Sequence, residues 1–396
     1  GSGKTMVAAF AAFVALRNGY QAALMAPTEI LAEQHFKKLE ELLAPAGFRV
    51  GRLQGSMTRK NKQQTCQRLA GHELDLVVGT HALIQEGVEF ANLGLVVVDE
   101  QHKFGVMQRT VLRQKGRNPD LLVMTATPIP RTLALTLYGE LEVSRLDQMP
   151  PGRQPIRSES VRFQQRQRIY EEIRAEVAQG RQAYIVCPLI DENESLEATA
   201  AVEEAQILRT QVFPEFSVGL LHGRMKAAEK DEVMEGFRQG RLHILISTTV
   251  IEVGVDVPNA TIMLVQDANR FGLAQLHQLR GRVGRGSHAS RCIFMGDATS
   301  PQTHRRLQAI ARLSDGFEVA EEDLQIRGPG DFYGVHQAGF PELKVADLLR
   351  DTDLLDLARE AAREVMAGDP HLEAPEHLVL RQHFADLEAR TAEMVH

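Results

Sequence analysis

The stretch LGLVVVDEQH, from Leu93 to His102, decides the fold class. Residues Leu95–Val98 form a continuous apolar run rich in β-branched side chains, which is typical of a strand buried on both faces of a parallel sheet. The run ends abruptly at Asp99 and Glu100. Ligands of open α/β sheets bind at the carboxyl ends of the strands, so we expect both carboxylates to face a site. One could hold Mg²⁺ and the other could orient or deprotonate a water molecule; a solvated acidic turn is the alternative.

Length and charge narrow the possible classes of protein. The chain has 396 residues, enough for two or three domains, and a formal net charge of −7. Any nucleic-acid binding must therefore use local basic patches. No apolar run approaches the roughly 20 residues of a membrane span, and there is no signal-peptide pattern. The three cysteines, Cys66, Cys187 and Cys292, lack the spacing of metal ligands and are interpreted as reduced, buried thiols of a cytosolic protein.

The first residues match the second half of a phosphate-binding loop, G-x-x-x-x-G-K-[ST]. We therefore expect an N-terminally truncated fragment; a cloning remnant is the alternative. The Ala-rich run Thr5–Leu16 predicts a buried helix that ends at Asn18-Gly19 and presents its N-terminus to phosphate. The backbone N–H groups of Gly1, Ser2 and Gly3 would cradle the phosphates, Lys4 would neutralise their charge, and the Thr5 hydroxyl would coordinate Mg²⁺.

Strands and helices alternate through the first half of the chain, which predicts a parallel sheet covered by helices. The expected strands, besides the acidic one, are 22–26, 50–53, 74–78 and 121–124, and the expected helices are 30–43 and 60–69. Three strand ends carry hydroxyl or proline motifs: APTEILAEQH (26–35), GTHAL (79–83) and TATP (125–128). Such hydroxyls can donate to phosphate oxygens, although Thr also commonly caps a helix.

The second half predicts another α/β domain after the Pro/Gly-rich linker MPPGRQP (149–155). Its expected strands are 183–187, 218–221, 242–247 and 261–265, and an acidic helix is expected over 192–207. Five arginines between 153 and 168 form either a solvated face or a phosphate contact. The stretch QLHQLRGRVGRG (275–286) contains Q-x-x-G-R-x-G-R, in which two arginines could fork onto phosphate oxygens; a surface Arg/Gly loop is the alternative.

Together, GSGKT, APTEILAEQH, VVVDEQH, TATPIPRT, STTVIEVGVDVPNA (247–260) and the arginine motif resemble motifs of a superfamily 2 helicase motor. The resemblance implies two RecA-like parallel-sheet lobes of the P-loop NTPase class, with ATP and Mg²⁺ between them. It makes Asp99 and Glu100 the residues that hold the metal and activate water, and Arg282 and Arg285 the arginine fingers, with Gln278 nearby. It also implies nucleotide contacts at Gly254 and Asp256. The residues implied to couple nucleotide to DNA are Pro27, Thr28, Thr80, His81, His102, Thr125, Thr127 and Thr248.

The tail SDGFEVAEEDLQIRGPGDFYGVHQAG (314–339) has an amphipathic helical piece over 317–324. It resembles the translocation motif of the RecG family of bacterial branched-DNA helicases, which the transcription-repair coupling factor shares. In that motif an Arg and a Gln relay motor closure to duplex DNA, and the resemblance implies these roles for Arg327 and Gln337. The alternative is a Gly/Pro turn after a packing helix. DEQHKFGVMQR (99–109), the PPGRQP linker and RGPG favour the RecG family. Helical segments are expected over 346–366 and 376–394.

The resemblance implies an ATP-dependent helicase that moves on duplex DNA and remodels stalled forks and Holliday junctions in recombination and repair. It implies a cytoplasmic, nucleoid-associated monomer with branched DNA, and with single-strand-binding protein, as partners. The expected domains are lobe 1 (1–148), a linker (149–156), lobe 2 (157–300), and the translocation motif with a helical tail (301–396). The family's N-terminal wedge domain is expected to be missing. Because the incomplete phosphate loop should weaken ATP binding, we predict little or no helicase activity from this fragment. A coupling-factor translocase, an RNA unwinding enzyme, and an inactive nucleotide- or DNA-binding module are the alternatives.

Overall fold

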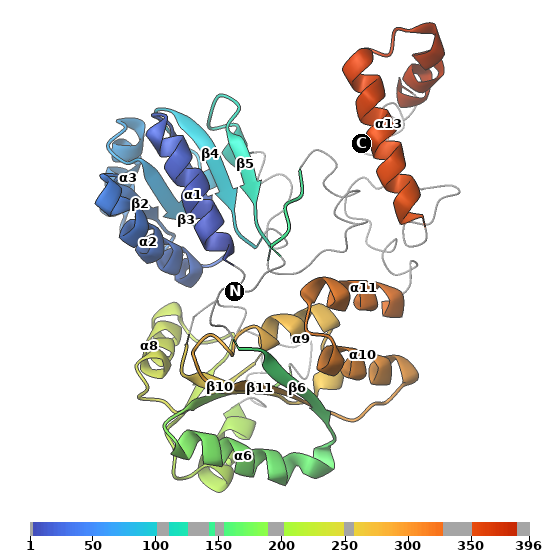
Figure 1. Ribbon diagram of the computed structural model, residues 1–396. Coiled ribbons are helices and arrows are strands. Elements are labelled where there is room, and N and C mark those ends of the chain that lie inside the picture. The colour runs from blue at the N-terminus through green and yellow to red at the C-terminus, as the bar shows by residue number, and fades with distance from the viewer. Residues whose placement is uncertain are drawn as a thin grey trace. The chain divides into compact units, whose positions relative to one another are not determined.

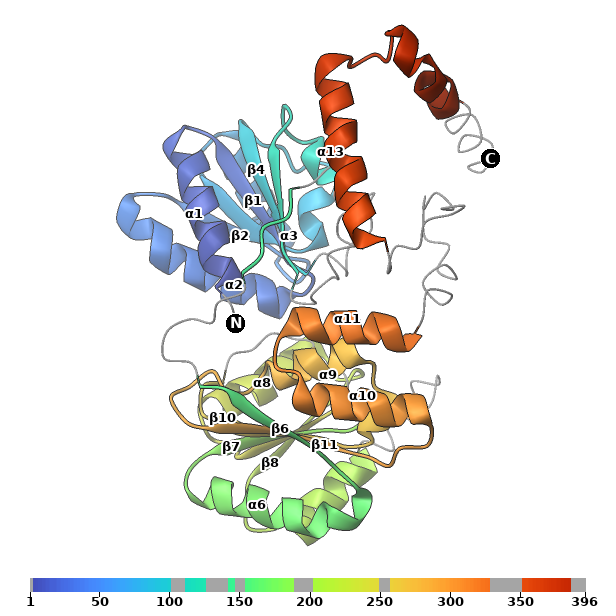
Figure 2. The same ribbon diagram turned by 45° about the vertical axis from the view of Figure 1, so that its right-hand side comes forward.

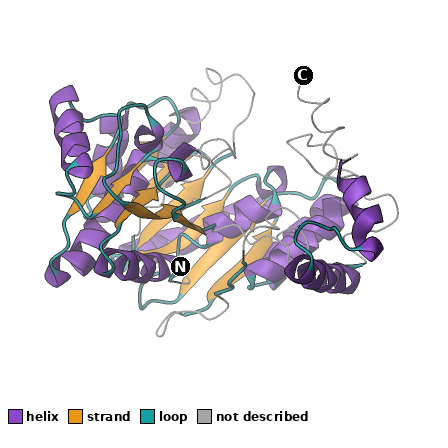
Figure 3. Ribbon diagram, turned by 90° about the horizontal axis from the view of Figure 1, so that it is seen from above, coloured by secondary structure: helices purple, strands orange, loops and turns teal. Residues whose placement is uncertain are grey.

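The computed structural model describes residues 3–100, 111–125, 142–146, 154–188, 202–248, 257–327 and 351–385. Contacts divide these residues into two compact units: the described parts of 1–128 with 145–323, and the described parts of 129–144 with 324–396. Two parallel sheets with flanking helices lie in the first unit (Figures 1 and 3). The predicted α/β class with two parallel-sheet lobes is confirmed.

The strands are β1 (Gln21–Met25), β2 (Val50–Leu53), β3 (Leu76–Gly79), β4 (Leu93–Val98), β5 (Asp120–Val123), β6 (Ile156–Val161), β7 (Gln182–Val186), β8 (Val218–Leu221), β9 (Ile244–Ser247), β10 (Ala260–Val265) and β11 (Ser290–Met295). The α-helices are α1 (Lys4–Arg17), α2 (Glu29–Leu43), α3 (Arg59–Ala70), α6 (Arg166–Ala178), α8 (Ala227–Arg238), α9 (Leu273–Arg280), α10 (Pro301–Arg312), α11 (Gly316–Arg327) and α13 (Thr352–Gly368). Shorter helical turns are η1 (Ala44–Ala46), η2 (His81–Ile84), η4 (Phe163–Gln165), η5 (Leu208–Val212), η7 (Ala268–Arg270) and η8 (Pro375–His377).

The first sheet has the order β2-β3-β1-β4-β5, and every adjacent pair is parallel. Alternate residues of its central strands enter two different cores, as the period of a strand requires. Leu24, Val78 and Val97 pack with α1 and α2 on one face. Met25, Val77 and Val96 pack on the other face with Leu69 of α3. This two-sided burial explains why β4 is apolar without alternation, and it confirms the predicted buried strand (Figure 2).

The second sheet has the order β6-β11-β10-β7-β9-β8 and is also parallel throughout. Helix α6 packs on one face, where Ile169 and Ile173 meet Ile185, Ile246 and Leu264. Phe237 of α8 covers β7 on the other face, with 4.8 Å between its ring centroid and that of Tyr184.

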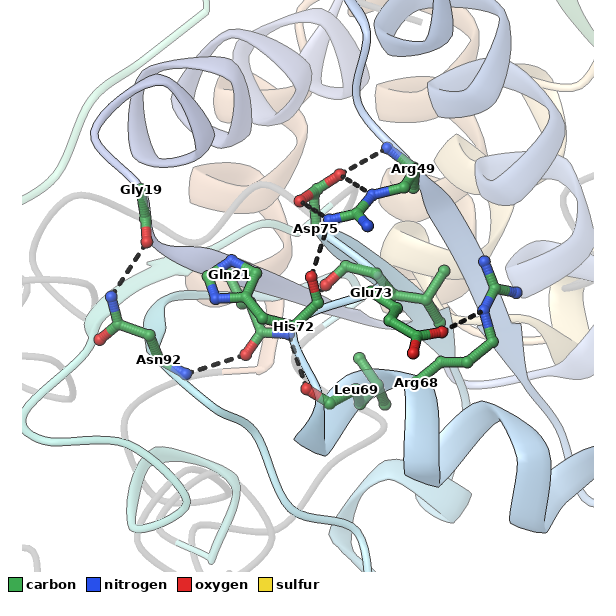
Figure 4. A network of polar contacts seen from close by, with 10 residues as sticks. Gly19, Gln21, Arg49, Arg68, Leu69, His72, Glu73, Asp75 and Asn92 are labelled. Atoms are coloured by element: carbon green, nitrogen blue, oxygen red, sulfur yellow. Dashed lines mark hydrogen bonds and ion pairs between the residues drawn. The ribbon is translucent and has the colours of Figure 1, made fainter.

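A buried glutamine makes equivalent hydrogen bonds at the amino-terminal end of a central strand in each sheet. In the first lobe the Gln21 Nε2 group donates to the Leu69 and Leu74 carbonyls at 2.9 and 2.8 Å, and its Oε1 accepts from the Asn92 backbone N–H at 2.9 Å (Figure 4). In the second lobe Gln182 Nε2 donates to the Phe237 and Leu242 carbonyls at 2.6 and 2.7 Å. Each buried amide therefore ties the first residue of a central strand to the end of a helix and the turn after it.

Helix α1 departs from its prediction as a buried helix. Its residues Ala8, Ala12 and Leu16 are buried, but Phe10 on the outer face is 70% exposed, and Met6 and Val14 are also exposed. The helix is apolar all round, so its sequence cannot show which face packs on the sheet.

The remaining predictions fall partly outside the described residues. Cys187 and Cys292 are buried as expected, whereas Cys66 is only half-buried; all three are free thiols. Of the acidic helix expected over 192–207, only 202–207 are described, and these are helical. Among the helices that the structure describes, none combines the length and the apolar composition needed to cross a bilayer.

Candidate nucleotide and nucleic-acid site

Within the described residues, no side chain caps the N-terminus of α1. Gly3 precedes the helix with φ 94°, a left-handed conformation that suits glycine. Gly3 provides no side-chain cap, and the first turn of α1 holds no acidic residue. Lys4 and Thr5 stand half-buried in this turn. A helix end of this kind suits phosphate, because its N–H groups and dipole favour negative charge. Gly1 and Ser2 lie outside the described residues.

The acidic pair stands at the carboxyl end of β4. The Asp99 backbone N–H donates to the Met25 carbonyl at 2.9 Å, which extends the pairing of β4 with β1 by one residue. Its side chain is buried and accepts from His35 Nε2 at 2.7 Å. Glu100 follows with φ 50°, a left-handed conformation that costs a glutamate about 1–3 kcal/mol. Strained backbone is often found at functional sites, so the outlier suggests a role for the Glu100 carboxylate.

The chemistry of these donors fits a magnesium ion. Thr5 offers a hydroxyl, and Asp99 and Glu100 offer carboxylates, which are the hard oxygen ligands that Mg²⁺ prefers. Both segments belong to the first lobe, since α1 packs against β1 and β4. A cage of three or more His, Cys, Asp or Glu side chains is not found in the described part of the chain. Mg²⁺ does not need one, because it usually keeps several waters and the phosphates of its nucleotide.

The threonines at the strand ends fall into two groups. Thr28 caps α2 by accepting from the Leu31 backbone N–H at 3.3 Å, the alternative considered from the sequence. Thr80 follows β3 and Thr248 follows β9, both are at most 2% exposed, and neither hydroxyl has a partner within the described ranges. A buried hydroxyl without a hydrogen bond is costly, so these two are candidates for an external oxygen such as phosphate.

Three other candidates of the first lobe are described by their position in the chain. Pro27 directly precedes the cap of α2, His81 begins η2 with an exposed side chain, and Thr125 follows β5. His102 and Thr127 lie outside the described residues, as do Gly254 and Asp256 of the second lobe and Gln337 of the tail. Arg327 is the last residue of α11, and its side chain is not described.

The arginine motif forms the end of α9 and the loop that follows. Gln278 is on the helix, and Arg282 and Arg285 stand half-buried in the loop. The Arg285 Nε group donates to the Gly281 carbonyl at 3.0 Å, which fixes the base of its side chain. Gly284 has φ 71°, and a Cβ there would lie 2.7 Å from Ile156 Cγ1. The motif therefore needs glycine at this position to bring the loop close to β6.

Arg280, one residue before this loop, was not predicted as a site residue. Its guanidinium is buried and donates to the carbonyl of Ile310 in the last turn of α10 and to the carbonyls of Leu313 and Ser314, which precede α11. It also donates to His277 Nδ1 at 2.7 Å. Burial, and then the Arg280 charge, lowers the pKa of His277 to about 4, so the ring is neutral at neutral pH and can accept. Arg280 thus joins the arginine motif to the start of α11.

The arginines that follow the linker are described in part. Arg168 lies 3.5 Å from a Glu159 oxygen and 3.8 Å from a Glu172 oxygen. Arg291 of β11 pairs with the same two glutamates. Arg168 therefore belongs to an ion-paired surface, the first of the two alternatives, and Arg153 lies outside the described residues.

Three family models match successive parts of the chain. The DEAD/DEAH box helicase model matches residues 1–136, the helicase conserved C-terminal domain model matches 164–287, and the model of domain 3 of ATP-dependent DNA helicase RecG matches 313–395. The chain is 54% identical over 381 residues to ATP-dependent DNA helicase RecG of Synechocystis sp., covering 96% of this chain and 46% of that protein. It is 51% identical over 381 residues to the RecG of Bacillus subtilis, covering 96% and 56%.

A solved structure supports the same assignment. The structure of RecG bound to a three-way DNA junction shares 45% identity and a TM-score of 0.72 with this chain, covering 90% of this chain and 46% of that one. The chain spans about half the length of the relatives it matches, from 46% of the Synechocystis protein to 56% of the Bacillus protein. On these matches, which together extend over nearly all of its residues, the chain belongs to the RecG family of ATP-dependent DNA helicases.

Proposed function

We propose that this chain is the ATP-hydrolysing motor of a branched-DNA helicase, which moves on duplex DNA and remodels stalled forks and Holliday junctions in recombination and repair. One observation carries the proposal beyond family membership. A helix N-terminus with Lys4 and Thr5 and the carboxylates of Asp99 and Glu100 belong to a single lobe, as an ATPase requires.

The residues divide the chemistry as follows. Lys4 and the first N–H groups of α1 would bind the phosphates, while Thr5 and Asp99 would hold Mg²⁺. Bound Mg²⁺ would neutralise phosphate charge. Glu100 would orient the attacking water and accept its proton. Arg282 and Arg285, whose charge is permanent, would stabilise the charge that develops on the transferred phosphoryl group, with Gln278 beside them in the motif. Gly254 and Asp256 would contact the nucleotide.

The DNA contacts would lie on the strand-end loops and the tail. Thr80 and Thr248 are the best supported, because their buried hydroxyls have no partner among the described residues. Pro27, Thr28, His81, His102, Thr125 and Thr127 are proposed with them from the resemblance. Arg327 and Gln337 would transmit lobe movement to the duplex. We propose the domain boundaries 1–148, 157–300 and 301–396, joined by the linker 149–156, in a monomeric cytoplasmic protein that binds single-strand-binding protein.

The test is the ATPase rate of the full-length protein without nucleic acid and with single-stranded RNA, linear duplex DNA or a model fork. We expect the fork to stimulate most. Lys4→Ala should abolish nucleotide binding, whereas Glu100→Gln should retain binding and lose turnover by about 10²-fold or more. Equal stimulation by linear duplex would favour a coupling-factor translocase, and stimulation by RNA alone would overturn the DNA assignment.

A further inference from the structure

His35 is a buried histidine that contacts the acidic pair from another element. It stands on α2, on the stripe formed by Ala32, Leu39 and Leu43, and is 7% exposed. Its Nε2 lies 2.7 Å from Asp99 Oδ2. An ionised carboxylate can only accept, so Nε2–H donates to it. The imidazole is the one polar side chain of that apolar stripe, and it is aimed at the carboxyl end of β4.

The contact acts on one oxygen of the Asp99 carboxylate. With Oδ2 hydrogen-bonded to His35, rotation of the carboxylate is restricted, so Oδ1 is the oxygen that would bind a cation. Histidine–carboxylate pairs that orient a metal ligand are common, and their loss typically costs about 10–100-fold in metal affinity. A pair that served packing alone would not depend on which atom of the histidine ring reaches the carboxylate.

Helix α2 connects this pair to the strand-end loops. Thr28 caps its N-terminus, seven residues before His35, so about 10 Å of helix separates them. Glu29 holds the loop after β2, because its Oε1 accepts from the Ser56 backbone N–H at 2.8 Å and its carbonyl accepts from Gln54 Nε2 at 3.2 Å. The start of α2 therefore contacts a loop at the proposed DNA-binding edge, and His35, two turns later in the same helix, contacts Asp99.

We propose that His35 is a positioning residue that orients the Asp99 carboxylate for a divalent cation and links the movement of α2 to that cation. The inference rests on the proposed ATPase function. It assigns to α2 a role that no strand-end loop fulfils: a shift of the helix along its axis would move the imidazole and turn the carboxylate. His35 does not touch the nucleotide in this proposal.

The test measures metal binding rather than turnover. His35→Phe removes the donor and keeps the ring volume, while His35→Gln places an amide N–H near the position of Nε2. Lys37→Asn, at an exposed position of the same helix, is the matched control. Mn²⁺ affinity is measured by electron paramagnetic resonance with a non-hydrolysable ATP analogue in the full-length protein, and affinity for the analogue is measured separately in EDTA.

We expect His35→Phe to weaken Mn²⁺ binding about 10-fold or more, His35→Gln to recover most of the loss, and both to leave metal-free nucleotide affinity within about 2-fold. Mn²⁺ affinity unchanged in His35→Phe would overturn the proposal. If that variant does not fold, His35→Asn, whose shorter amide cannot reach Oδ2, must show the same weakening relative to His35→Gln. Failure of the proposed function is separate: it would show as wild-type Mn²⁺–nucleotide binding without stimulation of ATPase by DNA.

Discussion

Replacing Gln21 by methionine tests whether the buried amide holds the first lobe together. Methionine has a similar length and volume, so the change removes hydrogen bonds and leaves packing nearly intact. The Leu69 carbonyl keeps a second donor, the His72 backbone N–H at 3.2 Å. The Leu74 carbonyl loses the Gln21 amide in a residue that is 1% exposed. Asn92, whose N–H also loses its partner, is exposed and can bind water.

One buried orphan carbonyl costs about 1–3 kcal/mol, and the solvated N–H adds at most about 1 kcal/mol. We therefore expect Gln21→Met to lower the free energy of unfolding of the first lobe by about 1–4 kcal/mol. Two lobes need not unfold together, so a single transition is not assumed. Urea unfolding followed by circular dichroism gives the size of the loss, and hydrogen exchange with mass spectrometry gives its location.

Gln182, the equivalent glutamine of the second lobe, supplies the control. Gln21→Met should speed amide exchange in β3 and the end of α3, and leave β9 and the end of α8 unchanged. Gln182→Met should do the reverse. Gln67→Met, at an exposed position of α3, should change neither. A loss below about 0.5 kcal/mol in Gln21→Met, or one equal to that of Gln67→Met, would refute the reasoning.

Three further predictions concern the site. Thr80→Val should keep or raise the melting temperature, because it removes an orphan hydroxyl, while weakening duplex binding in fluorescence anisotropy; a lower melting temperature would contradict this. Arg280→Lys should destabilise the second lobe by about 2 kcal/mol or more in urea unfolding, since one ammonium cannot replace a fork that serves three carbonyls. His277 binds a proton more tightly when unfolded, so stability should fall, by up to about 3 kcal/mol, as pH drops from 6.5 toward 4; His277→Gln should flatten that slope in melts at pH 7, 6 and 5.

Position in the sheet did not decide which strands could be predicted: the edge strands β2, β5 and β8 were predicted, whereas β6 at an edge and β11 in the interior of the second sheet were missed. The apolar runs of β1, β4, β7 and β10 were placed within one or two residues. β6 was missed because IRSESV (156–161) has four consecutive polar residues between its apolar ends, which gives neither an apolar run nor an alternation. The outer face of α1 was missed for another reason, because a helix without a polar side gives no indication of which face packs.

Motifs predicted where the candidate residues stand on helices and strands, but not the contacts that hold those residues. Lys4, Asp99 and the arginine loop stand at a helix start, a strand end and a helix end, as their motifs require. His35 and Arg280 were missed, although each stands at an apolar phase of its helix, which is a detectable signal. The Asp99 partner of His35 is 64 residues away, and the carbonyls that accept from Arg280 are 30–34 residues away. No local pattern specifies a pairing at that separation.

The left-handed backbone of Glu100 means that selection for stability and selection for activity favour different residues at this position. Holding a glutamate at φ 50° costs the fold about 1–3 kcal/mol, and glycine would relieve most of it. A population screened only for heat resistance should therefore lose the glutamate early, and with it the activation of water that we propose for this residue. Selection for stability alone would not retain this glutamate. If a lineage selected for thermal stability keeps it, selection for the proposed activity must also have acted on that lineage.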